Sequence, residues 1–181
     1  KMNVYIYGPK DDPYHRTPNW RKPYPAREGE ELKVLVNRAK ENNVIFYWAI
    51  HPGQDIRWNE EDRSLLLQKF ESMYQLGVRG FAVFFDDISG EGTKADKQAE
   101  LLNYIDDHFV KVKRDVAPLI LCPTEYNKSW TDVEGGYLTT LGDKLNEGIK
   151  VMWTGDMVVA TIDKSTLDFV NPLQIGRASC R

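Results

Sequence analysis

The chain has 181 residues, of which 41% are hydrophobic and 28% charged, and its formal net charge is -3. These proportions are ordinary for a globular protein, and the length suffices for one domain with a sizeable core. The chain has no Lys/Arg run suited to following phosphates and no apolar run of membrane-spanning length, so we expect neither nucleic acid nor a membrane as partner. It starts with Lys1 and shows no signal peptide, which leaves localisation open.

The two cysteines lie in different surroundings. Cys122 ends an apolar run, which predicts a buried, reduced thiol. Cys180 lies in the segment 174–181, which reads QIGRASCR and resembles the translation of a sequencing adapter. We expect this tail to be non-native and to be no part of the fold. A short disordered natural tail is the alternative.

Five short apolar or β-rich runs are candidate strands. Several are apolar throughout, which is typical of strands buried on both faces of a parallel sheet. In chain order the runs are Val4–Tyr7, Val44–Ile50, Phe81–Phe85, Leu119–Cys122 and Ile149–Trp153.

Helical patterns fill the gaps between the first four runs. A helix is predicted after Asn59, because Asn caps a free N–H and three acidic residues follow it, and Gly77 offers the stop. Two more helices are predicted over about 30–41, with Leu35 among the inward residues, and over about 94–111. Strands that alternate with helices in this way predict a parallel α/β fold.

Two architectures fit this alternation: a complete five-stranded open sheet, and about five of the eight units of a (β/α)8 barrel. An open sheet gathers its ligand groups where the strand order reverses, whereas a barrel uses the loop after every strand. Here a cluster of polar or aromatic residues follows each of the five runs. We therefore predict an α/β fold, a (β/α)8 TIM barrel truncated to about five β/α units, formed by residues 1–171.

Two adjacent carboxylates, Asp86 and Asp87, follow the third apolar run directly. A metal site with Glu91 is one interpretation, but no His lies at ligand spacing and the alternation of a calcium loop is absent. A solvated acidic loop is another. General acid–base chemistry is favoured, because two neighbouring carboxyls disfavour each other's charge, so that one can remain a proton donor. Such an unequal pair is typical of glycoside hydrolysis.

Aromatic residues gather in or just after the predicted strand ends. Their faces pack on sugar C–H surfaces while their polar edges bond hydroxyls, which favours a carbohydrate ligand. We expect Trp48 to belong to the core instead, and core packing and sugar contact are both open for Trp58 and Trp153. The full set is Trp48, Trp58, Trp130, Trp153, Tyr126 and Tyr137.

Five motifs in order closely resemble glycoside hydrolase family 84, the bacterial O-GlcNAcase-like β-N-acetylglucosaminidases. The resemblance covers residues 1 to about 171, and it depends on the series rather than on the Asp-Asp pair alone. The motifs read YIYGPKDDPY from Tyr5, WAIHPG from Trp48, FFDDI from Phe84, CPTEY from Cys122 and MWTG from Met152.

The resemblance implies retaining hydrolysis of terminal β-linked GlcNAc by substrate-assisted catalysis, in which the substrate's acetamido oxygen attacks and forms an oxazoline. It implies that Asp86 orients the acetamido N–H, and that Asp87 protonates the glycosidic oxygen and then activates water. Tyr126 is expected to bond the acetamido oxygen, and Lys10 to contact sugar hydroxyls. The pocket for the N-acetyl methyl is assigned to Cys122, Trp130, Thr154 and Val158.

The resemblance further implies no cofactor, no metal, and a GlcNAc-bearing glycan or glycoprotein as substrate. It is compatible with a secreted or periplasmic location. On this interpretation residues 1–171 are a partial catalytic domain, with one barrel strand before Lys1 and two after residue 171. The alternative is a catalytically silent barrel that binds sugar or protein. The intact set of Asp86, Asp87, Tyr126 and Lys10 argues against it, because a binding module needs no acid–base pair.

Overall fold

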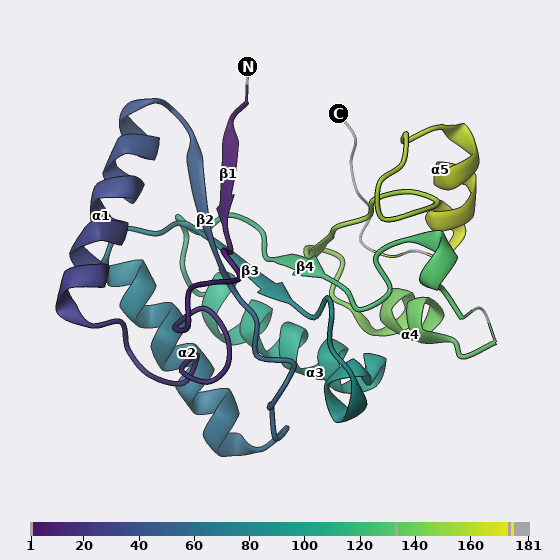
Figure 1. Ribbon diagram of the computed structural model, residues 1–181, viewed down its shortest axis with the longest axis horizontal. Helices are drawn as coiled ribbons and strands as arrows, with labels where there is room; N and C mark the ends of the chain where they lie inside the picture. Colours follow the sequence, from purple (N-terminus) through teal and green to yellow (C-terminus); the bar gives the residue numbers. More distant parts are fainter. Residues whose placement is uncertain (1, 133, 174, 176–181) are drawn as a thin grey trace.

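The computed structural model describes residues 2–132, 134–173 and 175. They form a parallel sheet in which every strand pairs with the next one in the chain, in the order β1-β2-β3-β4-β5 (Figure 1). The strand order never reverses, which is the arrangement of a barrel wall and not of a doubly wound open sheet. The strands are β1 (Val4–Tyr7), β2 (Ile45–Ile50), β3 (Gly80–Phe84), β4 (Ile120–Cys122) and β5 (Lys150–Val151).

All five predicted strands are present. β2 and β3 are the most buried, with five of six and four of five residues buried, as expected for strands covered on both faces. The fifth strand is shorter than its predicted range of 149–153, although Met152 N–H still donates to the carbonyl of Leu121 at 2.8 Å. The α/β barrel prediction is therefore confirmed for the wall that these residues form.

Helices connect consecutive strands and two more follow β5, and they lie outside the sheet (Figure 1). Asn59 caps α2 as predicted, since its side chain accepts from the Asp62 N–H at 2.9 Å. Gly77 follows that helix with φ +104, a value that favours glycine. The α-helices are α1 (Ala26–Glu41), α2 (Glu60–Gln75), α3 (Ala95–Ile105), α4 (Tyr137–Lys144) and α5 (Lys164–Val170), with short helices η1 (Gly90–Thr93), η2 (Asp106–Val110), η3 (Lys128–Trp130) and η4 (Asn171–Leu173).

Two features differ from the sequence-based expectations. Leu35 was predicted to face inward but is exposed, because the buried stripe of α1 runs through Gly29, Leu32 and Val36. The predicted helix over 94–111 changes type on the way, from α3 to the π-helical turn η2. Its apolar face is nevertheless buried as predicted.

Aromatic side chains form the core between β2, β3 and the helices behind them. Phe70 of α2 stacks on Phe81 of β3 at 4.9 Å between ring centroids, and meets Trp48 of β2 edge-on at 6.0 Å. Phe109 of η2 closes the cluster against Phe81 at 4.9 Å. Each such pair adds about 0.5–1.5 kcal/mol beyond the area it buries. The packing anchors the two strands whose ends carry the candidate site, and it confirms Trp48 as a core residue.

The predicted tail lies almost wholly outside the described residues. Of 174–181, only Ile175 is described, and it is buried against the core. The non-native origin of the tail, and the surroundings of Cys180, stay predictions. Among the described residues, no helix is long and apolar enough to cross a membrane.

Candidate active site

The predicted site residues follow different strands and meet at one edge of the sheet. In a parallel sheet all carboxyl ends lie on the same side, so loops from distant parts of the sequence converge there. Lys10 follows β1, the Asp86-Asp87 pair follows β3, Tyr126 follows β4, and Thr154 follows β5. The fold therefore gathers residues that are up to 144 positions apart, from Lys10 to Thr154.

Asp86 and Asp87 occupy unequal positions. Asp87 has φ +53, so the chain leaves the extended conformation there and the two side chains need not point to opposite faces. The side chain of Asp86 is 16% exposed, against 47% for Asp87. A non-glycine residue in the left-handed region is strained, and such residues concentrate at functional sites. One carboxylate is thus set into the protein and the other faces outward.

Lys10 brings positive charge to both carboxylates. Its Nζ hydrogen-bonds Oδ2 of Asp87 directly and lies 3.8 Å from Oδ2 of Asp86. The hydrogen bond to Asp87, followed by the charges of the two aspartates, outweighs partial burial and raises the pKa of Lys10. The lysine side chain is mostly exposed, so the ion pair lies at the open mouth of the site.

Cys122 and Tyr126 also lie close enough to the aspartate pair for its charge to shift their pKa values. Burial, and then the charges of Asp86 and Asp87, raise the pKa of the Cys122 thiol, which stays protonated. Burial, and then the charges of Asp87 and Asp86, raise the pKa of the Tyr126 hydroxyl. Both groups are therefore present in neutral form, and Tyr126 keeps a proton to donate. Cys122 is buried and reduced, as the sequence predicts.

The loops after β4 and β5 are joined by backbone hydrogen bonds. Thr154 N–H donates to the carbonyl of Tyr126 at 3.0 Å, and Lys128 N–H donates to that of Gly155 at 3.0 Å. Trp130 meets the ring of Tyr126 edge-on, with centroids 4.8 Å apart. Thr154 and Trp130 are thus placed next to Tyr126, and their assignment to the N-acetyl pocket stays a prediction.

Val158 has the weakest structural connection to the pair. It lies beyond Thr154 in an irregular segment and is 44% exposed. Thr154 Oγ1 donates to the carbonyl of Met157 at 2.9 Å, which ties the segment to the site through its backbone. The role assigned to Val158 stays a prediction, as do the roles of the other site residues.

Trp153 and Trp58, for which both core packing and sugar contact were open, make hydrogen bonds within the protein through their indole N–H groups. Trp153 Nε1–H donates to Thr166 Oγ1 at 3.1 Å, and its ring stacks with Phe169 of α5 at 5.9 Å. Trp58 Nε1–H donates to the carbonyl of Glu91 at 3.0 Å. These contacts favour packing over ligand contact for both.

One close neighbour of Asp86 was not selected from the sequence. His51, directly after β2, donates through Nε2–H to the backbone carbonyl of Asp86 at 2.7 Å. The signal in the sequence is its place in the motif WAIHPG, directly after the predicted strand Val44–Ile50, but no local pattern links this histidine to Asp86. Within the described part of the chain, no group of three His, Cys, Asp or Glu side chains could hold a metal ion.

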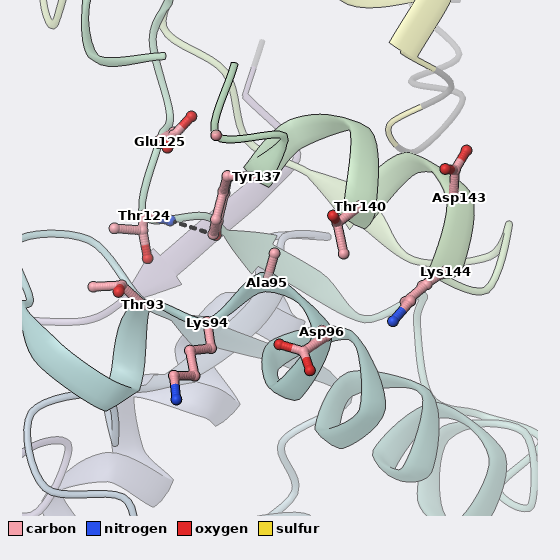
Figure 2. A pocket seen from close by; sticks show the side chains of 11 residues that line it. Thr93, Lys94, Ala95, Asp96, Thr124, Glu125, Tyr137, Thr140, Asp143 and Lys144 are labelled. Atoms are coloured by element: carbon pink, nitrogen blue, oxygen red, sulfur yellow. Dashed lines mark hydrogen bonds between the residues drawn. The ribbon is translucent and has the colours of Figure 1, made fainter. Parts of the chain in front are cut away.

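A broad hollow of about 580 Å³ lies beside the site, between the start of α3 and α4 (Figure 2). Neither Asp86 nor Asp87 lines it. Its wall supports the segment that carries the aspartate pair, since Tyr137 accepts from Thr124 N–H at 2.8 Å and Thr124 Oγ1 donates to the carbonyl of Phe85 at 2.9 Å. The candidate site is the open edge of the sheet around the aspartate pair. The hollow lies next to it, and the residues of its wall support the site.

A barrel wall with two unequal carboxylates at its carboxyl edge is an arrangement found in glycoside hydrolases. A family model described as beta-N-acetylglucosaminidase matches residues 1–179, and the chain belongs to this family. The family suggested by the five sequence motifs is thereby confirmed.

Curated relatives include the Protein O-GlcNAcase of Rattus norvegicus and that of Mus musculus, each 37% identical over 169 residues. The match covers 88% of this chain and 18% of each relative, so the chain spans about a fifth of their length.

Solved structures agree with the barrel wall. CpGH84B superposes with a TM-score of 0.89 at 41% identity, covering 96% of this chain and 32% of that one. A mutant of the Thermobaculum terrenum O-GlcNAc hydrolase gives a TM-score of 0.84 at 30% identity, covering 95% and 39%. CpGH84D gives 0.86 at 36%, covering 97% and 30%.

Proposed function

We propose that the protein is a retaining β-N-acetylglucosaminidase that removes terminal β-linked GlcNAc from glycans or glycoproteins. The observation that carries the proposal is the unequal Asp86-Asp87 pair at the carboxyl edge of the sheet, 16% and 47% exposed. Family membership supports the reaction class, and the names of the relatives support O-GlcNAc as the sugar.

The proposed reaction uses the substrate's own acetamido group. The acetamido oxygen attacks the anomeric carbon while the bond to the leaving oxygen breaks, which gives an oxazoline. Asp86 accepts a hydrogen bond from the acetamido N–H and stabilises its developing positive charge. Asp87 gives its proton to the leaving oxygen, then takes a proton from the water that opens the oxazoline. Because nucleophile and electrophile belong to one molecule, the attack gains a large effective molarity.

The neighbours of the pair fit the same scheme. The Tyr126 hydroxyl donates a hydrogen bond to the acetamido oxygen and orients that oxygen toward the anomeric carbon. Lys10 is drawn from Asp87 toward sugar hydroxyls when substrate enters, which its long, exposed side chain permits. Asp87 is then free of its ion pair and can carry the proton to be donated. Cys122, Trp130, Thr154 and Val158 surround the N-acetyl methyl.

The direct test is hydrolysis of an aryl N-acetyl-β-glucosaminide by the full-length gene product. The proposal expects turnover and release of the β-anomer first, observed by NMR. A well-folded protein that binds GlcNAc without turnover would instead support the silent binding barrel. Release of the α-anomer would contradict the retaining mechanism.

A further inference from the structure

His51 connects the ends of β2 and β3 where their backbone pairing has stopped. The last paired residues are Ile50 and Val83, so the carbonyl of Asp86 lies beyond the β2–β3 ladder. The imidazole supplies a donor to that carbonyl through Nε2–H at 2.7 Å. A carbonyl oxygen only accepts, so the proton is on Nε2. The side chain of His51 is 4% exposed, so the donor of this part-buried hydrogen bond is itself buried.

The same imidazole faces the carboxylate of Asp86. Oδ1 lies 3.5 Å from Nε2 of His51 and is buried, with no hydrogen-bond partner within the described part of the chain. Oδ2 points the other way, 3.8 Å from Nζ of Lys10. The carboxylate is therefore oriented by its surroundings: Oδ1 is turned inward to the histidine and Oδ2 outward to the open site.

A second buried histidine braces the first. The N–H of His51 donates to the carbonyl of His15 at 2.8 Å, and His15 Nδ1–H donates to the carbonyl of Ala49 at 2.6 Å. Burial lowers the pKa of His15, so it stays neutral beside its neighbour. The two rings lie 6.1 Å apart. The position of His51 is thus fixed from the β1 loop as well as from β2.

We propose that His51 is a positioning residue, which fixes the backbone and carboxylate of Asp86 so that Oδ2 meets the acetamido N–H. This inference rests on the proposed function, because it assigns His51 a role through Asp86 in that reaction. A shift of about 1 Å in a positioned group can cost about 100-fold in rate, so a buried donor at this point has a measurable effect.

The matched variants are His51→Gln and His51→Met. The two side chains have nearly the same shape, and only Gln carries an N–H near the place of Nε2. We expect kcat of His51→Gln within about 5-fold of wild type, and kcat of His51→Met lower by about 100-fold, with KM changed by less than about 3-fold. A purely structural role would lower thermal stability in both variants without this division between kcat and KM.

A double-mutant cycle shows whether His51 affects kcat through Asp86 or independently of it. In the Asp86→Asn background, His51→Met should cause little additional loss, because the oriented carboxylate is already gone. Full additivity of the two losses would overturn the inference. Should His51→Met fail to fold, His51→Asn replaces it, since its shorter amide cannot reach the carbonyl of Asp86.

The outcomes distinguish this inference from the function on which it rests. A wild-type protein without hydrolytic activity would contradict the proposed function. An active wild type with equal kcat in the Gln variant and in the Met or Asn variant would leave the function standing and overturn the role of His51. A large loss in kcat for Met or Asn, recovered by Gln, supports both.

Discussion

The two sides of the candidate site are built in different ways. At the ends of β2 and β3, buried side chains stabilise the site. His51 donates to the backbone carbonyl of Asp86, and an aromatic cluster packs behind both strands. At the ends of β4 and β5, the loops are joined mainly by backbone bonds, and Trp130 and Val158 are 46% and 44% exposed. We call the side at β2 and β3 the inner side and the side at β4 and β5 the outer side. We expect the inner side to fix the proposed reacting groups and the outer side to offer an adaptable surface to the ligand.

This comparison predicts the order of effects of single substitutions. Changes at the inner side should damage chemistry or stability strongly, and changes at the outer side should be mild. The following variants test that order from the largest expected effect to the smallest.

Asp87→Asn removes the proposed proton donor, the more exposed carboxylate of the pair. We expect kcat/KM to fall by about 100- to 10,000-fold for substrates with poor leaving groups, and far less for activated aryl leaving groups that need no protonation. A series of aryl glycosides of graded leaving-group acidity measures this. Asp143→Asn, an exposed carboxylate on α4, is the matched control. An equal loss across the series would contradict the acid role.

Asp62→Asn tests the inner scaffold through stability. Asp62 is buried and accepts from Arg21 Nε at 2.7 Å and Arg57 Nη2 at 2.5 Å. Burial alone raises the pKa of Asp62, but the hydrogen bonds from the two arginines outweigh it and hold that pKa far below its usual value. We expect the variant to lose about 3 kcal/mol of unfolding free energy at neutral pH.

The pH dependence of that loss follows from the direction of the shift. A pKa lower in the folded than in the unfolded state gives stability that is present above the unfolded value, about 3.9, and disappears as pH falls below it. The difference between the urea midpoints of wild type and Asp62→Asn should therefore be constant from pH 7 to about pH 5 and narrow as pH falls below about 4. A difference that stays constant down to pH 2 would contradict the ion-pair account. Asp107→Asn, which breaks an exposed pair with Lys111, should leave the midpoint unchanged.

Tyr126→Phe removes one hydroxyl from the outer side of the site, just after β4. The edge-on contact with Trp130 does not need the hydroxyl, so the ring should keep its place. We expect kcat to fall by about 10-fold, the effect of one hydrogen bond to a group that gains charge in the reaction. Steady-state kinetics on the N-acetyl substrate measure it. An unchanged kcat would remove Tyr126 from the proposed mechanism.

Val158→Ala tests the exposed outer loop and should have the smallest effect. The side chain is partly in water already, so little apolar contact is lost. We expect KM to rise by less than about 3-fold at constant kcat. A loss of kcat/KM comparable to that of Asp87→Asn would contradict the expectation that substitutions at the outer side have mild effects.

The sequence predicts the inner strands well because burial imposes a clear pattern. Continuous apolar runs identify β2 and β3, and a carboxylate pair after such a run is costly enough to indicate chemistry. The motif series also predicts which residues converge at the sheet edge, since in a parallel sheet every strand end lies on the same side.

Two short helices, one backbone turn and one long-range contact could not be predicted from the sequence, for physical reasons. α4 and α5 have eight and seven residues, too short for an apolar repeat to stand out. The left-handed turn at Asp87 has no glycine to mark it, because the surrounding fold imposes it. The contact between His51 and Asp86 spans 35 residues, so no local pattern encodes it.

The central claim is that the substrate's acetamido group is the nucleophile and Asp86 its support. The most direct measurement is kcat for aryl glucosaminides carrying acetyl, monofluoroacetyl, difluoroacetyl and trifluoroacetyl groups, in wild type and Asp86→Asn. Fluorine withdraws electrons from the attacking oxygen, so the account predicts a steep fall in wild-type kcat along the series. Rates that barely respond to fluorination would contradict it.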